Sequence, residues 1–298
     1  MLTIDRLSKT FDEAPVLDIV GFEVQSGSLC GLVGYNGAGK TTLMKIAADI
    51  YRADAGRVLL DGEDAVDNER VRQRLFFLPD ELYRLPQATL KGMADFYSGY
   101  YPTWNEQTFQ KLTEMFALNL RSRLQGFSKG MQRQAYLALA LSCQPRCLLL
   151  DESFDGLDPS KRNLMRRILL EYIAEKDACV LISSHNLPEL ENLCDHVVLL
   201  GGGRVLMDKG LDELQAGMGK YRLVFDRDVK REDFPGLDIR QFSSSGRVIT
   251  LSIQGEQERA EAALRAMNPV MLEAFPLTLA EIFISEMEEK EYDLTGLF

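Results

Sequence analysis

The sequence has few positive charges and no long hydrophobic run. Its 34 Lys and Arg residues face 45 Asp and Glu residues, so the formal net charge of the 298 residues is −11. A chain this acidic has no general attraction for phosphate backbones or anionic lipid, so we predict no nucleic-acid partner. No apolar run approaches the roughly 20 residues of a membrane-spanning helix, and the first residues lack the apolar core of a signal peptide. A role at a membrane must therefore come through a partner.

Cysteine and histidine are also scarce, with five and two residues. Four of the cysteines lie in apolar runs, which indicates reduced, buried thiols in a cytosolic protein. Cys143 and Cys147 bracket a Gln-Pro-Arg turn. A metal pair is the minor alternative there, because no second pair completes the usual four ligands. The ordinary composition and the length favour one large globular domain plus a small one.

Short apolar runs and helical periodicity alternate along the chain. Residues 28–34, 146–151 and 178–184 are nearly continuous apolar runs, typical of strands that are buried on both faces of a parallel sheet. Helical periodicity follows the first two runs, which predicts an α/β layer fold. Residues 2–7 and 56–63 alternate apolar and polar side chains and predict edge strands of an antiparallel sheet.

Strand patterns disappear between residues 78 and 134. Residues 90–101 and 105–118 have helical patterns and are separated by Pro102. Because proline interrupts a helix, we predict two helices in a helical insertion over about residues 80–135.

The character of the chain changes again after about residue 215. Strand patterns occupy residues 221–226 and 247–253, and helical patterns occupy residues 257–267 and 278–291. Mixed short elements of this kind predict an α+β layer arrangement. We therefore predict a large domain of residues 1–215 and a small C-terminal α+β domain of residues 216–298.

A glycine-rich loop follows the first buried strand. Gly34, Gly39, Lys40 and Thr41 have the spacing of a phosphate loop between a strand and a helix. Glycines let backbone N–H groups turn around a phosphate without Cβ clashes. We expect Lys40 to reach the terminal phosphates and the Thr41 hydroxyl to bind Mg²⁺. A chance glycine-rich turn is the alternative, and the strand–loop–helix context disfavours it.

Polar residues end the other two buried strands. Asp151 ends one of them and faces the crevice where open α/β sheets bind ligands, so we expect it to hold Mg²⁺. Glu152 is placed to accept a proton from water that attacks the terminal phosphate; an exposed acidic turn is the alternative. His185 ends the next strand and is predicted to bond the terminal phosphate, although a lone surface histidine is the alternative. His196 is predicted to be structural.

The stretch GFSKGMQRQ, residues 126–134, predicts a tight turn that opens a helix. Ser128, Lys129 and Gly130 form the turn. The first N–H groups of a helix lack partners and its dipole is positive there, so we predict an anion-binding corner. These residues alone leave open whether the same chain binds the anion.

Together the patterns resemble the ATP-binding subunits of ABC transporters. The resemblance covers residues 1 to about 215 with six motifs in order, and it implies an ATPase whose cofactors are ATP and Mg²⁺. Phe11 lies where the family has an aromatic that stacks on adenine. Asp151 and Glu152 match the Walker B aspartate and the catalytic glutamate, His185 the switch histidine, and residues 155–158 the D-loop. The matching phosphate loop implies nucleotide contacts from Gly34, Asn36, Gly37, Ala38, Gly39, Lys40, Thr41 and Thr42.

The signature motif of the family answers the question about the anion. It implies that Ser128 and Gly130 bind the γ-phosphate of an ATP held by a second ATPase chain, in a homodimer or heterodimer. The motif is commonly Leu-Ser-Gly-Gly-Gln, whereas this chain has Phe-Ser-Lys-Gly-Met. A second departure is Asp80, which stands where the family usually has a glutamine that contacts Mg²⁺. Asp80 is therefore expected as a metal ligand whose reach is in question.

The Ser-Lys-Gly-Met signature resembles that of one branch of bacterial exporters. The aromatic segment of residues 96–104 and the small C-terminal domain also resemble that branch, the latter more weakly. The resemblance implies an exporter ATPase that drives a polytopic membrane permease subunit. It further implies a cytoplasmic location, peripheral on the inner face of the cell membrane through the permease. The alternative is a soluble ABC-type ATPase that acts as an assembly factor.

Overall fold

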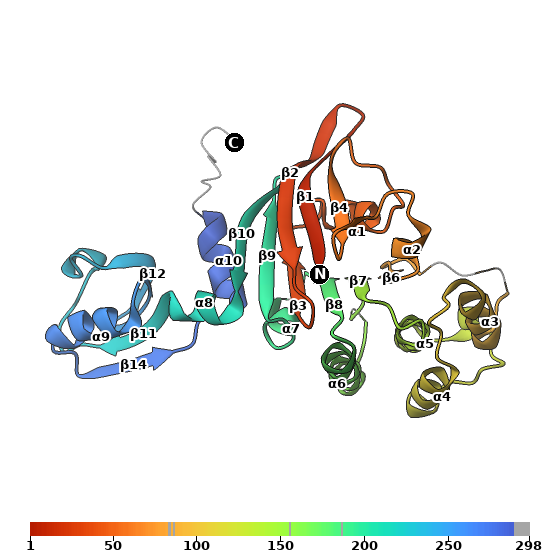
Figure 1. The fold of residues 1–298 in the computed structure, drawn as a ribbon. Helices are drawn as coiled ribbons and strands as arrows, with labels where there is room; N and C mark the ends of the chain where they lie inside the picture. The colour runs from red at the N-terminus through yellow and green to blue at the C-terminus, as the bar shows by residue number, and fades with distance from the viewer. Residues whose placement is uncertain (83–84, 86, 155, 186, 289–298) are drawn as a thin grey trace, which may run out of the picture. The chain divides into compact units, whose positions relative to one another are not determined.

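The computed structural model describes residues 1–82, 85, 87–154, 156–185 and 187–288. The chain divides into two compact units, Met1–Asp208 and Lys209–Phe298 (Figure 1). The domain end that the sequence predicts at residue 215 falls within helix α8 (Leu211–Ala216) of the second unit.

An antiparallel sheet with the strand order β2-β1-β4-β5 forms part of the first unit. Its strands are β1 (Leu2–Phe11), β2 (Ala14–Val24), β4 (Ala55–Leu60) and β5 (Glu63–Asp64). The predicted antiparallel pairing is confirmed, but the predicted edge position is wrong, because β1 lies between β2 and β4 and β4 lies between β1 and β5. Alternation of apolar and polar residues indicates that a strand has one buried and one exposed face, but it does not indicate how many strands lie beside it.

The second sheet of this unit has the order β10-β9-β3-β8-β7-β6. Its strands are β3 (Leu29–Val33), β6 (Leu75–Leu78), β7 (Cys147–Asp151), β8 (Cys179–Ser183), β9 (His196–Gly201) and β10 (Arg204–Gly210). The pairs β3–β8, β3–β9, β6–β7 and β7–β8 are parallel. Every residue of β3, β7 and β8 is buried, so the three apolar runs and the α/β fold are confirmed.

Helices follow the strands as the sequence predicts. Helix α1 (Lys40–Ala47) follows β3, and α6 (Pro159–Lys176) follows β7. One apolar core joins α1 to both sheets and contains Leu7, Leu43 and Leu149. This packing fixes the start of α1 at the carboxyl edge of the parallel sheet, where ligands of α/β folds bind.

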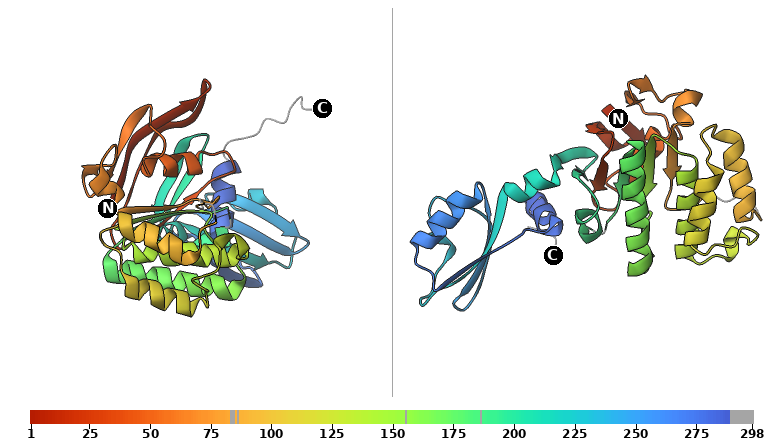
Figure 2. Two further views of the ribbon diagram at one scale, coloured as in Figure 1. Left: turned by 90° about the vertical axis from the view of Figure 1, so that its right-hand side faces the viewer. Right: turned by 60° about the horizontal axis from the view of Figure 1, so that its bottom comes forward.

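The insertion is helical. Its helices are α3 (Leu90–Tyr100), α4 (Glu106–Met115) and α5 (Lys129–Ser142), which lie together at one side of the unit (Figures 1 and 2). The side chains of Thr89 and Asn105 accept hydrogen bonds from the first turns of α3 and α4, which explains why both helices begin there. Two short helices, α2 (Glu69–Arg72) and α7 (Leu187–Glu191), precede β6 and follow β8.

The second unit contains an antiparallel sheet with the order β12-β13-β11-β14. Its strands are β11 (Met218–Val224), β12 (Asp238–Ser245), β13 (Val248–Gln254) and β14 (Met271–Phe275), and α9 (Gln257–Ala266) and α10 (Leu279–Glu288) are its longer helices. Tyr221, Leu251 and Leu264 share one core, so α9 packs on the sheet. Among the described residues, no helix combines the length and apolar character needed to cross a bilayer.

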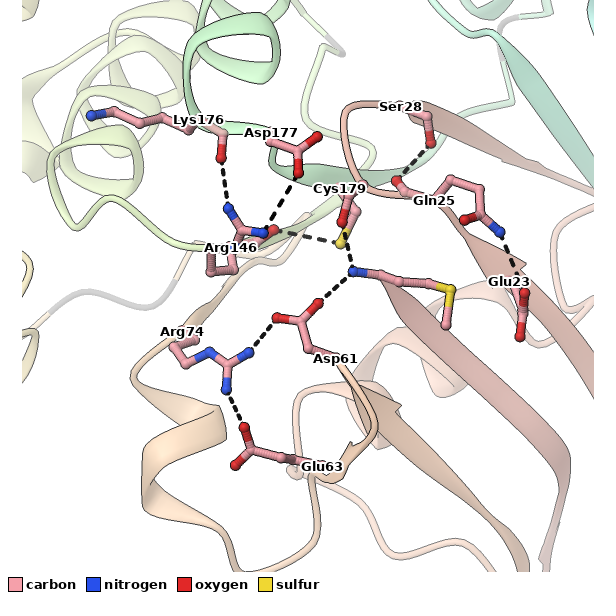
Figure 3. Close-up of polar contacts among 12 residues, drawn as sticks. Glu23, Gln25, Ser28, Asp61, Glu63, Arg74, Arg146, Lys176, Asp177 and Cys179 are labelled. Atoms are coloured by element: carbon pink, nitrogen blue, oxygen red, sulfur yellow. Dashed lines mark hydrogen bonds and ion pairs between the residues drawn. The ribbon is translucent and has the colours of Figure 1, made fainter.

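Charged groups form ion pairs and hydrogen bonds at the amino edge of the parallel sheet (Figure 3). Arg74, just before β6, donates to Glu63 at 2.6 Å and also bonds Asp61. The Arg74 carbonyl accepts from the backbone N–H groups of Arg146 at 2.7 Å and Cys147 at 3.0 Å. The guanidinium of Arg146 in turn donates to a backbone carbonyl of α6 at 2.8 Å. All five cysteines of the chain are buried, and none of them forms a disulfide.

Candidate nucleotide-binding and catalytic site

The phosphate loop joins β3 to α1 and depends on its glycines. A Cβ on Gly34 would lie 2.4 Å from the Leu200 carbonyl oxygen, so the backbone passes too close to β9 for any side chain. Gly39 has a φ of 101° and precedes α1, and a Cβ there would also meet Leu17 at 2.7 Å. Gly39 has no side chain to cap the helix, so the first N–H groups of α1 are available to an anion.

Lys40 is buried beneath this loop. Its Nζ donates to the carbonyl oxygens of Gly34 at 2.7 Å and Tyr35 at 3.2 Å. Burial lowers the pKa of Lys40 below its ordinary value, and the negative charges of Glu152 and Asp151 oppose that shift. A lysine that bonds only neutral carbonyls can exchange them for phosphate oxygens, which bond it more strongly because they are charged.

Asp151 ends β7 as a buried carboxylate. Its Oδ1 accepts from the Ser183 hydroxyl at 2.6 Å across the β7–β8 pair. Its Oδ2 is buried without a hydrogen-bond partner among the described residues. A buried carboxylate oxygen is costly to leave unpaired, and carboxylate oxygens are ligands that Mg²⁺ prefers. Asp151 lines a cavity of about 510 Å³ together with Thr41 and Asp80, so the three predicted metal ligands share one space and fit the ion.

Glu152 and His185 meet beyond the ends of β7 and β8. Oε2 of Glu152 lies 2.9 Å from Nδ1 of His185. Glu152 has a left-handed φ of 47°, a conformation that costs a non-glycine residue about 1–3 kcal/mol. Its N–H bonds the hydroxyl of Ser183 at 3.1 Å and the Ser183 carbonyl at 3.2 Å. Ser183 therefore holds both neighbouring carboxyl residues, and a strained backbone directs Glu152 toward the histidine.

Asp80 follows β6 and is held by the signature helix. Arg133 of α5 forms an ion pair with Oδ1 of Asp80 and donates to the Pro79 carbonyl at 3.1 Å. The Arg133 side chain is 8% exposed, whereas that of Asp80 is 58% exposed. Asp80 thus lies in the expected metal cavity, with one carboxylate oxygen already bonded to a guanidinium.

The signature residues stand at the start of α5. The Ser128 hydroxyl caps the helix by accepting from the Met131 N–H at 3.3 Å, and Ser128 itself is exposed. Gly130 is buried, although a Cβ there would make only ordinary contacts. Lys129 and His185 line a second cavity of about 700 Å³, which also contains Asp80. The corner is open to solvent, as a site for an outside ligand requires.

The remaining predicted residues have separate positions. Phe11 is 40% exposed and packs edge-on against Tyr51, with ring centroids 5.6 Å apart. Asp155, the first residue of the D-loop, lies outside the described residues. The last one, Asp158, caps α6 by accepting from the Lys161 N–H at 2.9 Å. His196 bonds Asp208 on the neighbouring strand.

Sequence reasoning missed two residues of this site. Ser183 stands in the stretch VLISSH directly opposite Asp151, and its polar side chain at the end of an apolar run was the available signal. Arg133 had no comparable signal, because its partner lies 53 residues away.

The fold and the site define a phosphate-loop nucleotide-binding protein with a carboxylate–histidine pair beside the loop.

Comparison with known proteins identifies the family. The ABC transporter family model matches residues 17–155. The ABC transporter ATP-binding protein YtrB of Bacillus subtilis is 29% identical over 97% of this chain and 99% of its own. The uncharacterized ABC transporter ATP-binding protein MJ1023 of Methanocaldococcus jannaschii is 30% identical over 78% of this chain and 87% of its own. A solved ATP-binding subunit of an ABC transporter has a TM-score of 0.67 and 29% identity, over 72% of this chain and 92% of that one.

This chain therefore belongs to the ATP-binding proteins of ABC transporters. It is an ATPase whose ligands are ATP and Mg²⁺, and the predicted fold class and activity are confirmed. A solved bacterial ABC transporter cassette of the same fold is described as dimeric, with a TM-score of 0.65 and 18% identity over 71% of this chain and 99% of that one. The alternative of a soluble assembly factor gains no support from these comparisons.

Proposed function

We propose that the residues gathered at the carboxyl edge of the parallel sheet bind and hydrolyse Mg-ATP. The N–H groups of the loop from Gly34 to Thr42 surround the phosphates, Lys40 bonds the terminal ones, and Phe11 stacks on adenine. Thr41, Asp151 and Asp80 would hold Mg²⁺, which would neutralise phosphate charge when bound. The other residues of this loop that contact the nucleotide are Asn36, Gly37, Ala38, Gly39 and Thr42.

The contact between Glu152 and His185 carries this proposal. Glu152 accepts a proton from the water that attacks the terminal phosphate, and His185 positions that water and the phosphate. The 2.9 Å contact between their side chains fixes the direction of the carboxylate. The neighbouring Asp151 has an unpaired oxygen among the described residues. Base, metal ligand and phosphate loop therefore lie at one edge of one sheet, which is the positioning that phosphoryl transfer needs.

We further propose that each ATP lies between two ATPase chains. Ser128 and Gly130 of one chain bind the γ-phosphate of an ATP held by the phosphate loop of the other. The exposed helix start and the adjoining 700 Å³ cavity support this role, and Lys129 adds a cation that favours an anion there. The chain carries a single set of motifs, so it supplies half of a two-site dimer with a copy of itself or with a related chain.

Mixing two inactive chains tests action between chains. Lys40→Ala damages the phosphate loop, and Ser128→Arg places a bulky cation at the signature corner. Ser128→Arg should keep ATP binding to the isolated chain and lose both dimerisation and hydrolysis. In a mixed dimer one site pairs an intact loop with an intact signature, so the mixture should recover part of the activity. Loss of nucleotide binding by a monomeric Ser128→Arg chain would contradict the proposal.

We also propose that the dimer drives a separate polytopic permease of a bacterial exporter, from the cytoplasmic side of the membrane. Of the aromatic residues in the insertion, Phe96 is 52% exposed and Tyr100 is 38% exposed, which supports a docking surface of the kind that interfaces use. Residues 1–215 would form the ATP-binding domain and residues 216–298 a separate small domain. Co-purification with a polytopic membrane protein tests the partner, and transport by membrane vesicles of known orientation tests the direction.

A further inference from the structure

Arg133 occupies an unusual position for a buried cation. Its guanidinium lies on the second turn of α5, close behind the signature corner, and its side chain is 8% exposed. A buried charge is stable only when it is paired and hydrogen-bonded. Among the described residues, the Arg133 guanidinium bonds the segment after β6, through the Pro79 carbonyl at 3.1 Å and the Asp80 carboxylate. The contact joins segments that are 53 residues apart.

Asp80 uses only part of its bonding capacity in this pair. Its Oδ1 bonds Arg133, and the contacts of the described residues give Oδ2 no partner. Asp80 lines the cavity that contains Thr41 and Asp151 as well as the cavity that contains Lys129 and His185. It therefore stands between the expected metal site and the signature corner with one oxygen available.

We propose that Arg133 is a positioning residue that holds Asp80 as a ligand for the divalent cation and links that ligand to the signature helix. The aspartate side chain is one methylene shorter than the usual glutamine, and the long arginine fixes it by charge and hydrogen bonding. Carboxylates that bind metals depend on such partners for their orientation, and loss of the partner costs about 10- to 100-fold in metal affinity. Because Arg133 belongs to the helix that begins at Ser128, movement of the signature corner also moves Asp80.

The inference rests on the proposed function, and metal affinity tests it without relying on turnover. Mn²⁺ replaces Mg²⁺ as the probe, and its binding to the full chain with a non-hydrolysable ATP analogue is followed by the electron paramagnetic resonance signal of free Mn²⁺. Arg133→Gln and Asp80→Asn should each weaken Mn²⁺ binding about tenfold. The double variant should be no weaker than Asp80→Asn alone, because Arg133 acts through Asp80.

Two further variants keep the test specific. Arg133→Lys retains the buried cation but not the forked geometry, so it should fold and lose an intermediate part of the Mn²⁺ affinity. Glu69→Gln removes a carboxylate of α2 that lines neither cavity, and it should leave Mn²⁺ affinity unchanged. In steady-state hydrolysis, Arg133→Lys should raise the KM for Mg²⁺ more than it lowers kcat at saturating metal.

Clear outcomes would overturn the inference. If Asp80→Asn leaves Mn²⁺ affinity unchanged, Asp80 is not a ligand of the metal. If both Arg133 variants leave Mn²⁺ affinity unchanged, Arg133 does not hold Asp80 in position. Multiplied losses in the double variant would show that Arg133 acts by another route. Failure of the unaltered chain to bind Mn²⁺ with the analogue would instead contradict the proposed function itself.

Discussion

At the amino edge of the parallel sheet the charged side chains are paired within the chain, whereas at the carboxyl edge they keep bonding positions for a ligand. Arg74 at the amino edge bonds two carboxylates, those of Asp61 and Glu63 (Figure 3). At the carboxyl edge the bonds of the Lys40 side chain to other described residues are to the backbone carbonyls of Gly34 and Tyr35. Oδ2 of Asp151 is buried there without a partner among the described residues. Charged groups at the amino edge of the sheet therefore stabilise the fold, whereas charged groups at the carboxyl edge are available to bind a ligand.

The difference follows from strand direction. At the carboxyl ends of parallel strands the chain must turn into a loop or helix, and helix starts there present free N–H groups to anions. At the amino ends the chain enters the sheet from other elements, and charged side chains there can form ion pairs that link those elements. Variants at the carboxyl edge should therefore change binding and turnover, while variants at the amino edge should change stability.

The largest effect is expected for Glu152→Gln at the carboxyl edge. The amide keeps the shape of the side chain but cannot accept a proton, so ATP hydrolysis should fall at least about a hundredfold. ATP should still bind, and dimers should accumulate in Mg-ATP on gel filtration. Hydrolysis at the unaltered rate would exclude Glu152 as the base.

Lys40→Ala should weaken ATP binding roughly tenfold or more, because a hydrogen bond between charged groups is worth about 1.5–3 kcal/mol. Titration with a fluorescent ATP analogue measures this. Burial lowers the pKa of Lys40, so ATP affinity of the unaltered chain should fall as the pH rises through that lowered pKa. Lys40→Ala has no cation to lose and should lack this alkaline decline. Equal affinity of the two chains at neutral pH would argue against a phosphate contact.

Arg74→Ala tests the amino edge. It removes a partly exposed cation that bonds Asp61 and Glu63, and the free energy of unfolding should fall by about 1 kcal/mol. Chemical denaturation measures the change, and affinity for the fluorescent ATP analogue serves as the control. Weaker ATP binding by a folded Arg74→Ala chain would break the proposed division between the two edges.

The smallest effect is expected from the titration of Asp61. Burial raises the pKa of Asp61, but its hydrogen bonds and ion pairs with the Met1 amino group and Arg74 outweigh this, so the pKa is lowered. A carboxyl group with a lowered folded-state pKa contributes stability that is present above the unfolded pKa and lost as pH falls through the folded pKa. Asp61→Asn should remove about 0.5 kcal/mol of that acid-dependent stability. Parallel pH profiles for both chains, from denaturation curves, would contradict this assignment.

Local patterns were sufficient for much of the first unit. The apolar runs that became β3, β7 and β8 and the spacing of the phosphate loop could be recognised without tertiary information, because burial on both faces and tight glycine turns leave local signals. Strand β2 was not predicted; it contains Pro15 and Gly21, which are uncommon in strands. Strands β9, β10, β12 and β14 were also not predicted.

The sequence by itself determined the class of chemistry, because Gly34, Lys40, Asp151 and Glu152 stand at fixed local spacings from the strands that carry them. Only the tertiary structure decided how these groups are held. Ser183 reaches Asp151 across a strand pair, and Arg133 reaches Asp80 from a helix 53 residues further along the chain. The physical reason is that the shape of a strand or loop depends on neighbouring residues, whereas a buried charge takes whichever partner the packed fold brings within bonding distance.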